Sequence, residues 1–153
     1  MRKIALMTAG GDAQVAELQK LIDEYQNLRI AIGHFGMVTV EGWQKQIELA
    51  CNKNVYVESG GITWLFNSEF YPYPSAVDAI LEAKSICGME KLMWGSDYPR
   101  TMTAITYRMS QDFVTKSDKL TETDKKLFLG ENAKKFYRFT DMPEISYTVH
   151  MAE

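Results

Sequence analysis

Two residues capable of proton chemistry lie just after apolar runs of the chain. His34 follows the run from Leu28 to Gly33, and Asp97 lies shortly after a run that ends at Trp94. A neutral imidazole can donate to an oxyanion, shuttle a proton or bind a metal ion. A carboxylate can act as a general base or hold a hard or borderline cation. The sequence leaves structural alternatives open: a buried histidine hydrogen-bonded to a neighbouring loop, and an aspartate in a turn or at a helix cap.

The ends of the other apolar runs carry weaker candidates. Glu58 and Ser59 follow Val55 to Val57, where they could contact a substrate, although a glutamate at a strand end is more often a solvated edge residue. Asp12 follows the first apolar run, and its position favours capping the next helix over catalysis. We take Glu58 and Ser59 as candidate substrate contacts, with a solvated edge residue as the alternative for Glu58, and we predict that Asp12 caps a helix.

The elements that position these residues are short apolar runs alternating with stretches of helical period. This alternation is typical of a parallel sheet with crossover helices, the α/β class. Strands this apolar are normally covered on both faces. The four predicted strands are Lys3 to Met7, Leu28 to Gly33, Val55 to Val57 and Lys91 to Trp94.

The sheet could be open or closed. An open flavodoxin-like sheet binds its ligand at a switch point, whereas a (β/α)8 barrel forms its site at the C-terminal ends of its strands. Every predicted strand ends in a turn with a polar or ionisable residue, which favours the barrel. Such barrels have about 250 residues, and this chain has 153. We therefore predict strands five to eight, about half of an eight-stranded barrel, over residues 1–139, with a C-terminal tail at 140–153.

Several function classes are disfavoured by composition and by missing motifs. The net charge is -3 and the basic residues are scattered, so nucleic acid is not an expected partner. No apolar run is long enough for a signal peptide or a membrane span, and we expect a cytoplasmic protein without membrane contact. Neither a phosphate-binding glycine motif nor a GxSxG elbow is present. Cys51 and Cys87 lack CxxC spacing, which fits reduced structural thiols.

Aromatic residues are concentrated between Trp64 and Tyr73. This segment could cover an apolar substrate or pack against another subunit, but a structural loop at the barrel rim is the simpler interpretation.

Taken together, several segments resemble the amidohydrolase-related family of metal-dependent barrel hydrolases, the branch with lactonases and decarboxylases of the aminocarboxymuconate semialdehyde type. The resemblance covers roughly Lys3 to Phe139 and depends on the order and spacing of the segments. These are Tyr25 to Gly36, Asn54 to Ser59, Lys91 to Pro99, and the closing helix around Leu129 to Phe136.

The resemblance implies roles for individual residues. His34 matches a catalytic acid/base or electrostatic group beside the metal. Asp97 matches a metal ligand that helps to activate water, and Tyr98 beside it is an expected substrate contact. The implied cofactor is a divalent metal, zinc. The chain lacks the HxH pair of the family's first strand, and Thr8 to Asp12 replaces the histidine that ends its fifth, so we expect no stable metal site in the isolated chain.

Two main hypotheses follow. In the first, the chain is part of a hydrolase for a small carboxylated or lactone-type substrate and needs a missing N-terminal half. In the second, it is a non-catalytic half-barrel that self-associates or binds a small ligand without metal. Unpaired edge strands and exposed apolar faces would favour a homo-oligomer. A flavodoxin-like cofactor domain is a third, weaker alternative.

Overall fold

The computed structural model describes residues 3–6 and 11–140. The predicted tail, apart from Thr140, lies outside the described residues, as do most of the residues between the first strand and the first helix. None of the described helices is both long and apolar enough to cross a membrane.

Four parallel strands form one sheet in the order β1-β2-β3-β4. They are β1 (Lys3–Leu6), β2 (Arg29–Ile32), β3 (Val55–Glu58) and β4 (Leu92–Met93). Because all strands are parallel and neighbours in sequence are neighbours in the sheet, their C-terminal ends lie along the same edge. The α/β class and the four predicted strands are confirmed, the second and fourth strands with shorter bounds than predicted; Met7, assigned to the first strand, lies outside the described residues.

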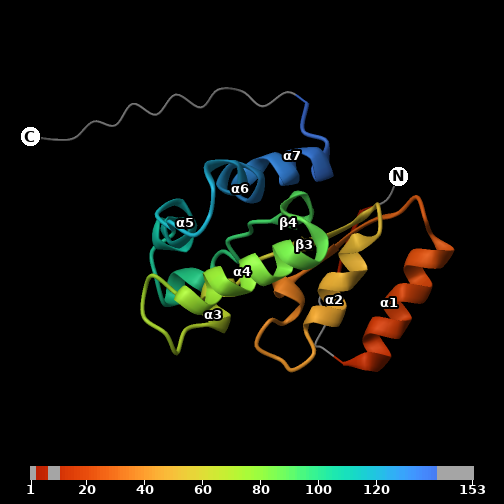
Figure 1. Ribbon diagram of the computed structural model, residues 1–153, viewed down its shortest axis with the longest axis horizontal. Helices are drawn as coiled ribbons and strands as arrows, with labels where there is room; N and C mark the ends of the chain where they lie inside the picture. Colours follow the sequence, from red (N-terminus) through yellow and green to blue (C-terminus); the bar gives the residue numbers. More distant parts are fainter. Residues whose placement is uncertain (1–2, 7–10, 141–153) are drawn as a thin grey trace, which may run out of the picture.

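One face of the sheet packs against the helices α1 (Asp12–Glu24), α2 (Gln44–Glu48) and α4 (Pro74–Cys87) (Figure 1). Side chains alternate between the faces of a strand, so every second strand residue points to this layer. The strand residues buried there are Ile30, Ile32, Val55, Val57 and Leu92. This helix-facing layer is the main hydrophobic core.

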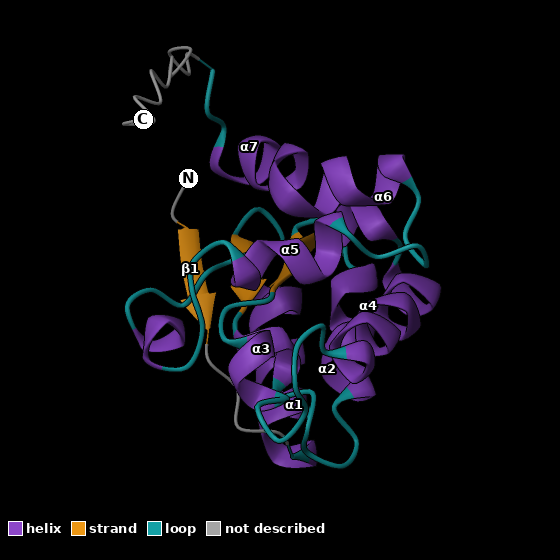
Figure 2. Cartoon of the chain, turned by 90° about the vertical axis from the view of Figure 1, so that its left-hand side faces the viewer, coloured by secondary structure: helices purple, strands orange, loops and turns teal. Residues whose placement is uncertain are grey.

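The opposite face of the sheet is covered by the C-terminal helix α7 (Asn132–Tyr137), which lies on the other side of the strands from α1, α2 and α4 (Figures 1 and 2). Ala31, Tyr56 and Met93 are buried beneath Phe136. The rings of Tyr56 and Phe136 have centroids 5.0 Å apart. Arg29 also donates a hydrogen bond to the Phe136 carbonyl. This face would otherwise expose apolar side chains.

The outer edge of β4 is closed by the segment that leads into α7. Met93 bonds to β3 through its carbonyl, which accepts from the Ser59 N–H, so the neighbouring polar groups point away from β3. On that outer side, the Asn132 side chain donates to the Leu92 carbonyl at 2.7 Å, and the Trp94 N–H donates to the Phe128 carbonyl at 2.8 Å. The expected unpaired edge is therefore wrong for β4. Self-association remains a prediction.

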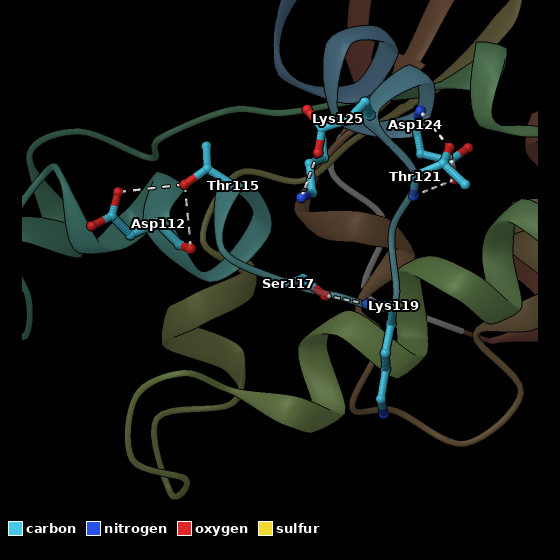
Figure 3. A network of polar contacts seen from close by, with 8 residues as sticks. Asp112, Thr115, Ser117, Lys119, Thr121, Asp124 and Lys125 are labelled. Atoms are coloured by element: carbon cyan, nitrogen blue, oxygen red, sulfur yellow. Dashed lines mark hydrogen bonds and ion pairs between the residues drawn. The ribbon is translucent and has the colours of Figure 1, made fainter.

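Two further helices connect β4 to this closing segment: α5 (Met109–Thr115) and α6 (Glu122–Lys126). Thr121 and Asp124 form a reciprocal capping box at the start of α6 (Figure 3). The buried Asp124 also accepts a hydrogen bond from Lys84 at 2.8 Å, which ties α6 to α4. The remaining short helical elements are α3 (Ile62–Leu65), η1 (His34–Gly36), η2 (Leu49–Cys51), η3 (Met89–Lys91), η4 (Arg100–Thr103) and the π-helix η5 (Leu127–Glu131).

Two local predictions are corrected by the structure. Asp12 does not cap α1: Gly11 occupies the N-cap position without a side-chain hydrogen bond, and Asp12 pairs instead with Lys45 at 2.6 Å. The aromatic segment is not wholly a loop, since Trp64 lies in α3. Helix propensity and charge alone do not distinguish a cap from the first helical residue, one position away.

Both cysteines are free. Cys51 is exposed, whereas Cys87 is partly buried at the end of α4. Burial raises the pKa of the Cys87 thiol to about 12, and the nearby Cys51 contributes in the same direction.

Candidate functional site

The candidate site lies where three adjacent strands end. His34 follows β2, Glu58 is the last residue of β3, and Asp97 follows β4. The carboxyl ends of neighbouring parallel strands meet at one edge, and that edge is where barrel enzymes hold their catalytic groups. The structure thus brings the three predicted residues to the same end of the sheet.

Gly61 is the point at which His34 and Asp97 come together. A Cβ atom on Gly61 would lie 3.0 Å from Asp97 Oδ2 and 3.6 Å from His34 Cδ2. Gly61 has φ +74°, a backbone conformation that favours glycine. The carboxylate and the imidazole therefore face one small space that only a residue without a side chain leaves open.

The Glu58 carboxylate lies beside this pair, above two more glycines. Its Oε1 is 1.3 Å from the position that a Cβ of Gly95 would take, and its Oε2 is 2.8 Å from that of Gly60. Burial raises the pKa of Glu58, the Gly60 N–H and His34 oppose this rise, and Asp97 adds to it. Glu58 therefore interacts electrostatically with both other candidates. Its contact with a substrate stays a prediction.

Ser59 is fully buried and connects the ends of β3 and β4. Its Oγ accepts a hydrogen bond from the Gly95 N–H at 3.2 Å, and its own N–H donates to the Met93 carbonyl at 2.8 Å. In this position Ser59 holds the Gly95 backbone beneath Glu58. Its predicted contact with substrate remains a prediction.

The backbone at both catalytic candidates is unusual. His34 has φ +51° and Asp97 has φ +51°, in the left-handed region that costs a non-glycine residue about 1–2 kcal/mol. Strain of this kind is concentrated at functional sites. Among the described residues, His34 Nδ1 is buried without a hydrogen-bond partner, and no side chain caps η4. Within the described part of the chain, His34 Nδ1 is therefore not bonded to a neighbouring loop and Asp97 does not cap η4, but Asp97 does lie in a turn, where its carbonyl accepts a hydrogen bond from the Thr101 N–H.

Tyr98 projects outward from the strand end, with 72% of its surface exposed. Its N–H donates to Ser96 Oγ at 3.2 Å. Its ring is free to meet a ligand, and its role as a substrate contact stays a prediction.

The described residues do not fit a complete metal site. Within residues 3–6 and 11–140, no group of three or more His, Cys, Asp or Glu side chains is placed to hold a metal ion. Catalytic zinc ordinarily takes three protein ligands. Asp97 could supply one of them, and the others would have to come from outside the described chain.

Sequence reasoning missed the part played by the glycines. Gly60, Gly61 and Gly95 lie in the turns expected after the third and fourth strands, but no role was predicted for them. Glycines within two or three residues of the ends of two neighbouring strands were the available signal, because side chains that crowd one strand end need space in the next.

A cavity of about 370 Å³ lies elsewhere, between the start of α4 and the end of α5. Tyr71, Val77 and Phe113 contribute apolar walls, and Lys116 and Lys119 lie among its lining residues. Both lysines pair with carboxylates of the chain, Lys116 with Asp112 and Lys119 with Asp78. None of the strand-end candidates lines this cavity, so it is separate from the predicted site.

A model of the amidohydrolase family matches residues 6–139. This match covers strands β2 to β4, the strand-end candidates and the closing helix α7. A search of curated proteins gave no match.

Solved amidohydrolases share the fold. A zinc-bound amidohydrolase from Burkholderia multivorans is similar over 89% of this chain and 53% of its own, with a TM-score of 0.71 and 17% identity. A probable 2-pyrone-4,6-dicarboxylic acid hydrolase from Acinetobacter baumannii, with citric acid bound, is similar over 90% of this chain and 52% of its own, with a TM-score of 0.65 and 22% identity.

A more distant neighbour is the 5-carboxyvanillate decarboxylase of Novosphingobium aromaticivorans, complexed with manganese and a nitrobenzoic acid. It is similar over 78% of this chain and 35% of its own, with a TM-score of 0.54 and 22% identity. The chain therefore spans about half the length of the first two structures, consistent with the predicted partial barrel.

Proposed function

Because the chain belongs to the amidohydrolase family, we propose that it carries the C-terminal half of the active site of a hydrolase. The observation behind the proposal is the convergence of His34 and Asp97 on Gly61. The proposed substrate is a small carboxylated or lactone-type compound. The names of the neighbours support this class, since one is a probable pyrone dicarboxylic acid hydrolase and another a carboxyvanillate decarboxylase.

In this proposal each side chain has a distinct part in moving protons. Asp97 accepts a proton from the attacking water, as a general base. His34 donates a hydrogen bond to the oxygen on which negative charge develops, or returns the proton to the leaving group. Glu58 lies beside the pair and interacts electrostatically with both, and burial raises its pKa above the ordinary value.

Two neighbours were crystallised with zinc or manganese. A divalent metal, when bound, polarises the group under attack and lowers the pKa of bound water. Asp97 is the ligand that this chain would offer. The described side chains do not supply the three protein ligands that a catalytic zinc ordinarily takes.

The missing ligands and the missing strands point to the same requirement. We propose that an N-terminal half-barrel, from a longer product or from a partner chain, completes the site. The second candidate function is a non-catalytic half-barrel that binds a small ligand or a second copy. One observation favours the form of this alternative that binds a small ligand: Phe136 covers the face of the sheet opposite α1, α2 and α4, and Asn132 bonds to the β4 edge, so that this surface is already buried within the chain.

The experiment compares hydrolysis by this chain alone with hydrolysis by the chain co-purified with the N-terminal half of the Burkholderia amidohydrolase. Proton release from a panel of lactones is followed in a pH-stat, with metal content measured on the same fractions. We expect activity and metal uptake only in the complemented sample. Asp97→Ala should abolish both, while Asp118→Ala, at an exposed position away from the site, should not. Hydrolysis that survives Asp97→Ala would contradict the proposal.

A further inference from the structure

A cation and an aromatic ring are in contact close to the candidate site. The Cζ atom of Arg100 lies 4.2 Å from the centroid of the Trp64 ring. Stacking of a guanidinium on an indole is a favourable cation–π contact. The two residues come from different segments, Trp64 from α3 and Arg100 from η4. The contact therefore joins the segment after β3 to the segment after β4.

Trp64 lies one helical turn beyond the meeting point of the catalytic pair. Gly61 is the N-cap of α3, and its carbonyl accepts the Leu65 N–H at 2.8 Å. Gly61 also borders Asp97 and His34, so the first turn of α3, which carries Trp64, begins at the site.

Arg100 is likewise one turn beyond Asp97. The Thr101 N–H donates to the Asp97 carbonyl at 3.2 Å, so the chain turns directly from Asp97 into η4. Arg100 is exposed, and it forms no ion pair with a carboxylate of the part of the chain that the structure describes. The Trp64 ring holds the positive charge of Arg100 in place, and no carboxylate of the described residues forms an ion pair with it.

This arrangement fits a specific kind of ligand. A planar guanidinium binds a carboxylate through two parallel hydrogen bonds, and stacking holds its fork in one orientation before the ligand arrives. The edge of an indole can pack against the face of another aromatic ring. We propose that Arg100 and Trp64 recognise the carboxylate and the ring of a planar acid, and so determine substrate specificity. The inference rests on the proposed function for the identity of the site, but the binding it describes needs neither catalysis nor metal.

The test uses the full chain and benzoate as the probe. Binding is followed by the indole N–H signals of the three tryptophans in NMR spectra, with benzamide as the uncharged ring of the same shape. We expect benzoate to shift one indole signal, which Trp64→Phe removes, and benzamide to bind at least tenfold more weakly. Arg100→Gln should weaken benzoate binding by about tenfold or more, because a charge-assisted pair is lost.

Arg108→Gln is the matched control, since Arg108 is an exposed arginine on the turn before α5 that pairs with Asp112. It should leave benzoate binding unchanged. Urea unfolding midpoints of the two variants separate recognition from support: a purely structural Arg100 would lower the midpoint without changing affinity.

Benzoate that binds Arg100→Gln as tightly as the parent, or that does not bind the parent at millimolar concentration, would overturn the inference. Arg100-dependent binding without any hydrolysis in the complemented sample would keep the inference and reject the proposed hydrolase. Hydrolysis of planar acids that Arg100→Gln leaves unchanged would support the proposed hydrolase and reject the inference.

Discussion

Replacing Gly61 with alanine tests the geometry of the site through stability. The substitution forces a side chain into a backbone with φ +74° and places a methyl group 3.0 Å from Asp97 Oδ2. The left-handed conformation costs about 1–2 kcal/mol. Displacing the Asp97 side chain from its preferred rotamer adds about 0.5–1.5 kcal/mol. We expect Gly61→Ala to lower the free energy of unfolding by about 1.5–3.5 kcal/mol.

The assay is urea unfolding followed by tryptophan fluorescence, in which this loss shifts the midpoint by about 1 M or more. Gly42→Ala is the matched control, because Gly42 has a similar φ of +77° and no atom within 4 Å of its Cβ position. It should show the backbone cost alone. In an Asp97→Ala background, Gly61→Ala should fall to the cost of Gly42→Ala, as in a double-mutant cycle. Equal costs for the two glycines in the parent chain would refute the proposed contact.

Three further predictions concern the scaffold. Burial raises the pKa of Asp124, but hydrogen bonds led by that from Lys84 outweigh it and hold the pKa below 3.8. The contribution of ionised Asp124 to stability is therefore present at neutral pH and is lost as the pH falls through the lowered pKa. Asp124→Asn should cost about 1–3 kcal/mol of unfolding free energy at pH 7 and little in strong acid, measured by urea unfolding. An equal cost at both pH values would refute this prediction. Iodoacetamide at pH 8 should modify Cys51 well before Cys87, whose thiol has a pKa of about 12, and mass spectrometry showing equal rates would contradict the assignment. Asn132→Ala removes two buried hydrogen bonds of 2.7 Å, to the carbonyls of Met89 in η3 and Leu92 in β4. It should therefore lower the unfolding midpoint by the equivalent of about 2–3 kcal/mol and increase the mass seen by light scattering. An unchanged midpoint and mass would show that this segment does not close the edge.

The sheet could be predicted because its strands are short, apolar and separated by helical stretches. Residues such as Ile30, Ile32 and Val57 have no other way to become buried than between two layers. Strand ends were less predictable. Lys91 was assigned to the fourth strand, but its Nζ instead donates to carbonyls around Asn52, and only Leu92 and Met93 belong to β4. Competing side-chain hydrogen bonds of this kind are not visible in hydrophobic periodicity.

The candidate site was predictable in its residue types but not in its arrangement. His34 and Asp97 stood out because each follows an apolar run. Their convergence depends on the left-handed backbone at Gly61, on the space left by Gly95 and on strand register, none of which periodicity reports.

The covering of the inner face by α7 could not be predicted for a different reason. The amphipathic pattern of a helix shows which of its own faces is buried but not which partner it packs against. Only the structure shows Phe136 packed in one cluster with Tyr56 and Met93.

The central claim is that the imidazole of His34 and the carboxylate of Asp97 share one site, and NMR spectroscopy of the histidine ring tests it most directly. The chain has two histidines, so a His150→Gln background leaves a single imidazole to observe. We predict that Asp97→Asn shifts the ring proton resonances of His34, whereas Asp118→Asn, which removes an exposed carboxylate outside the site, leaves them in place. Ring resonances that do not move in Asp97→Asn would mean that the two side chains do not face each other, and the proposed catalytic pair would be wrong.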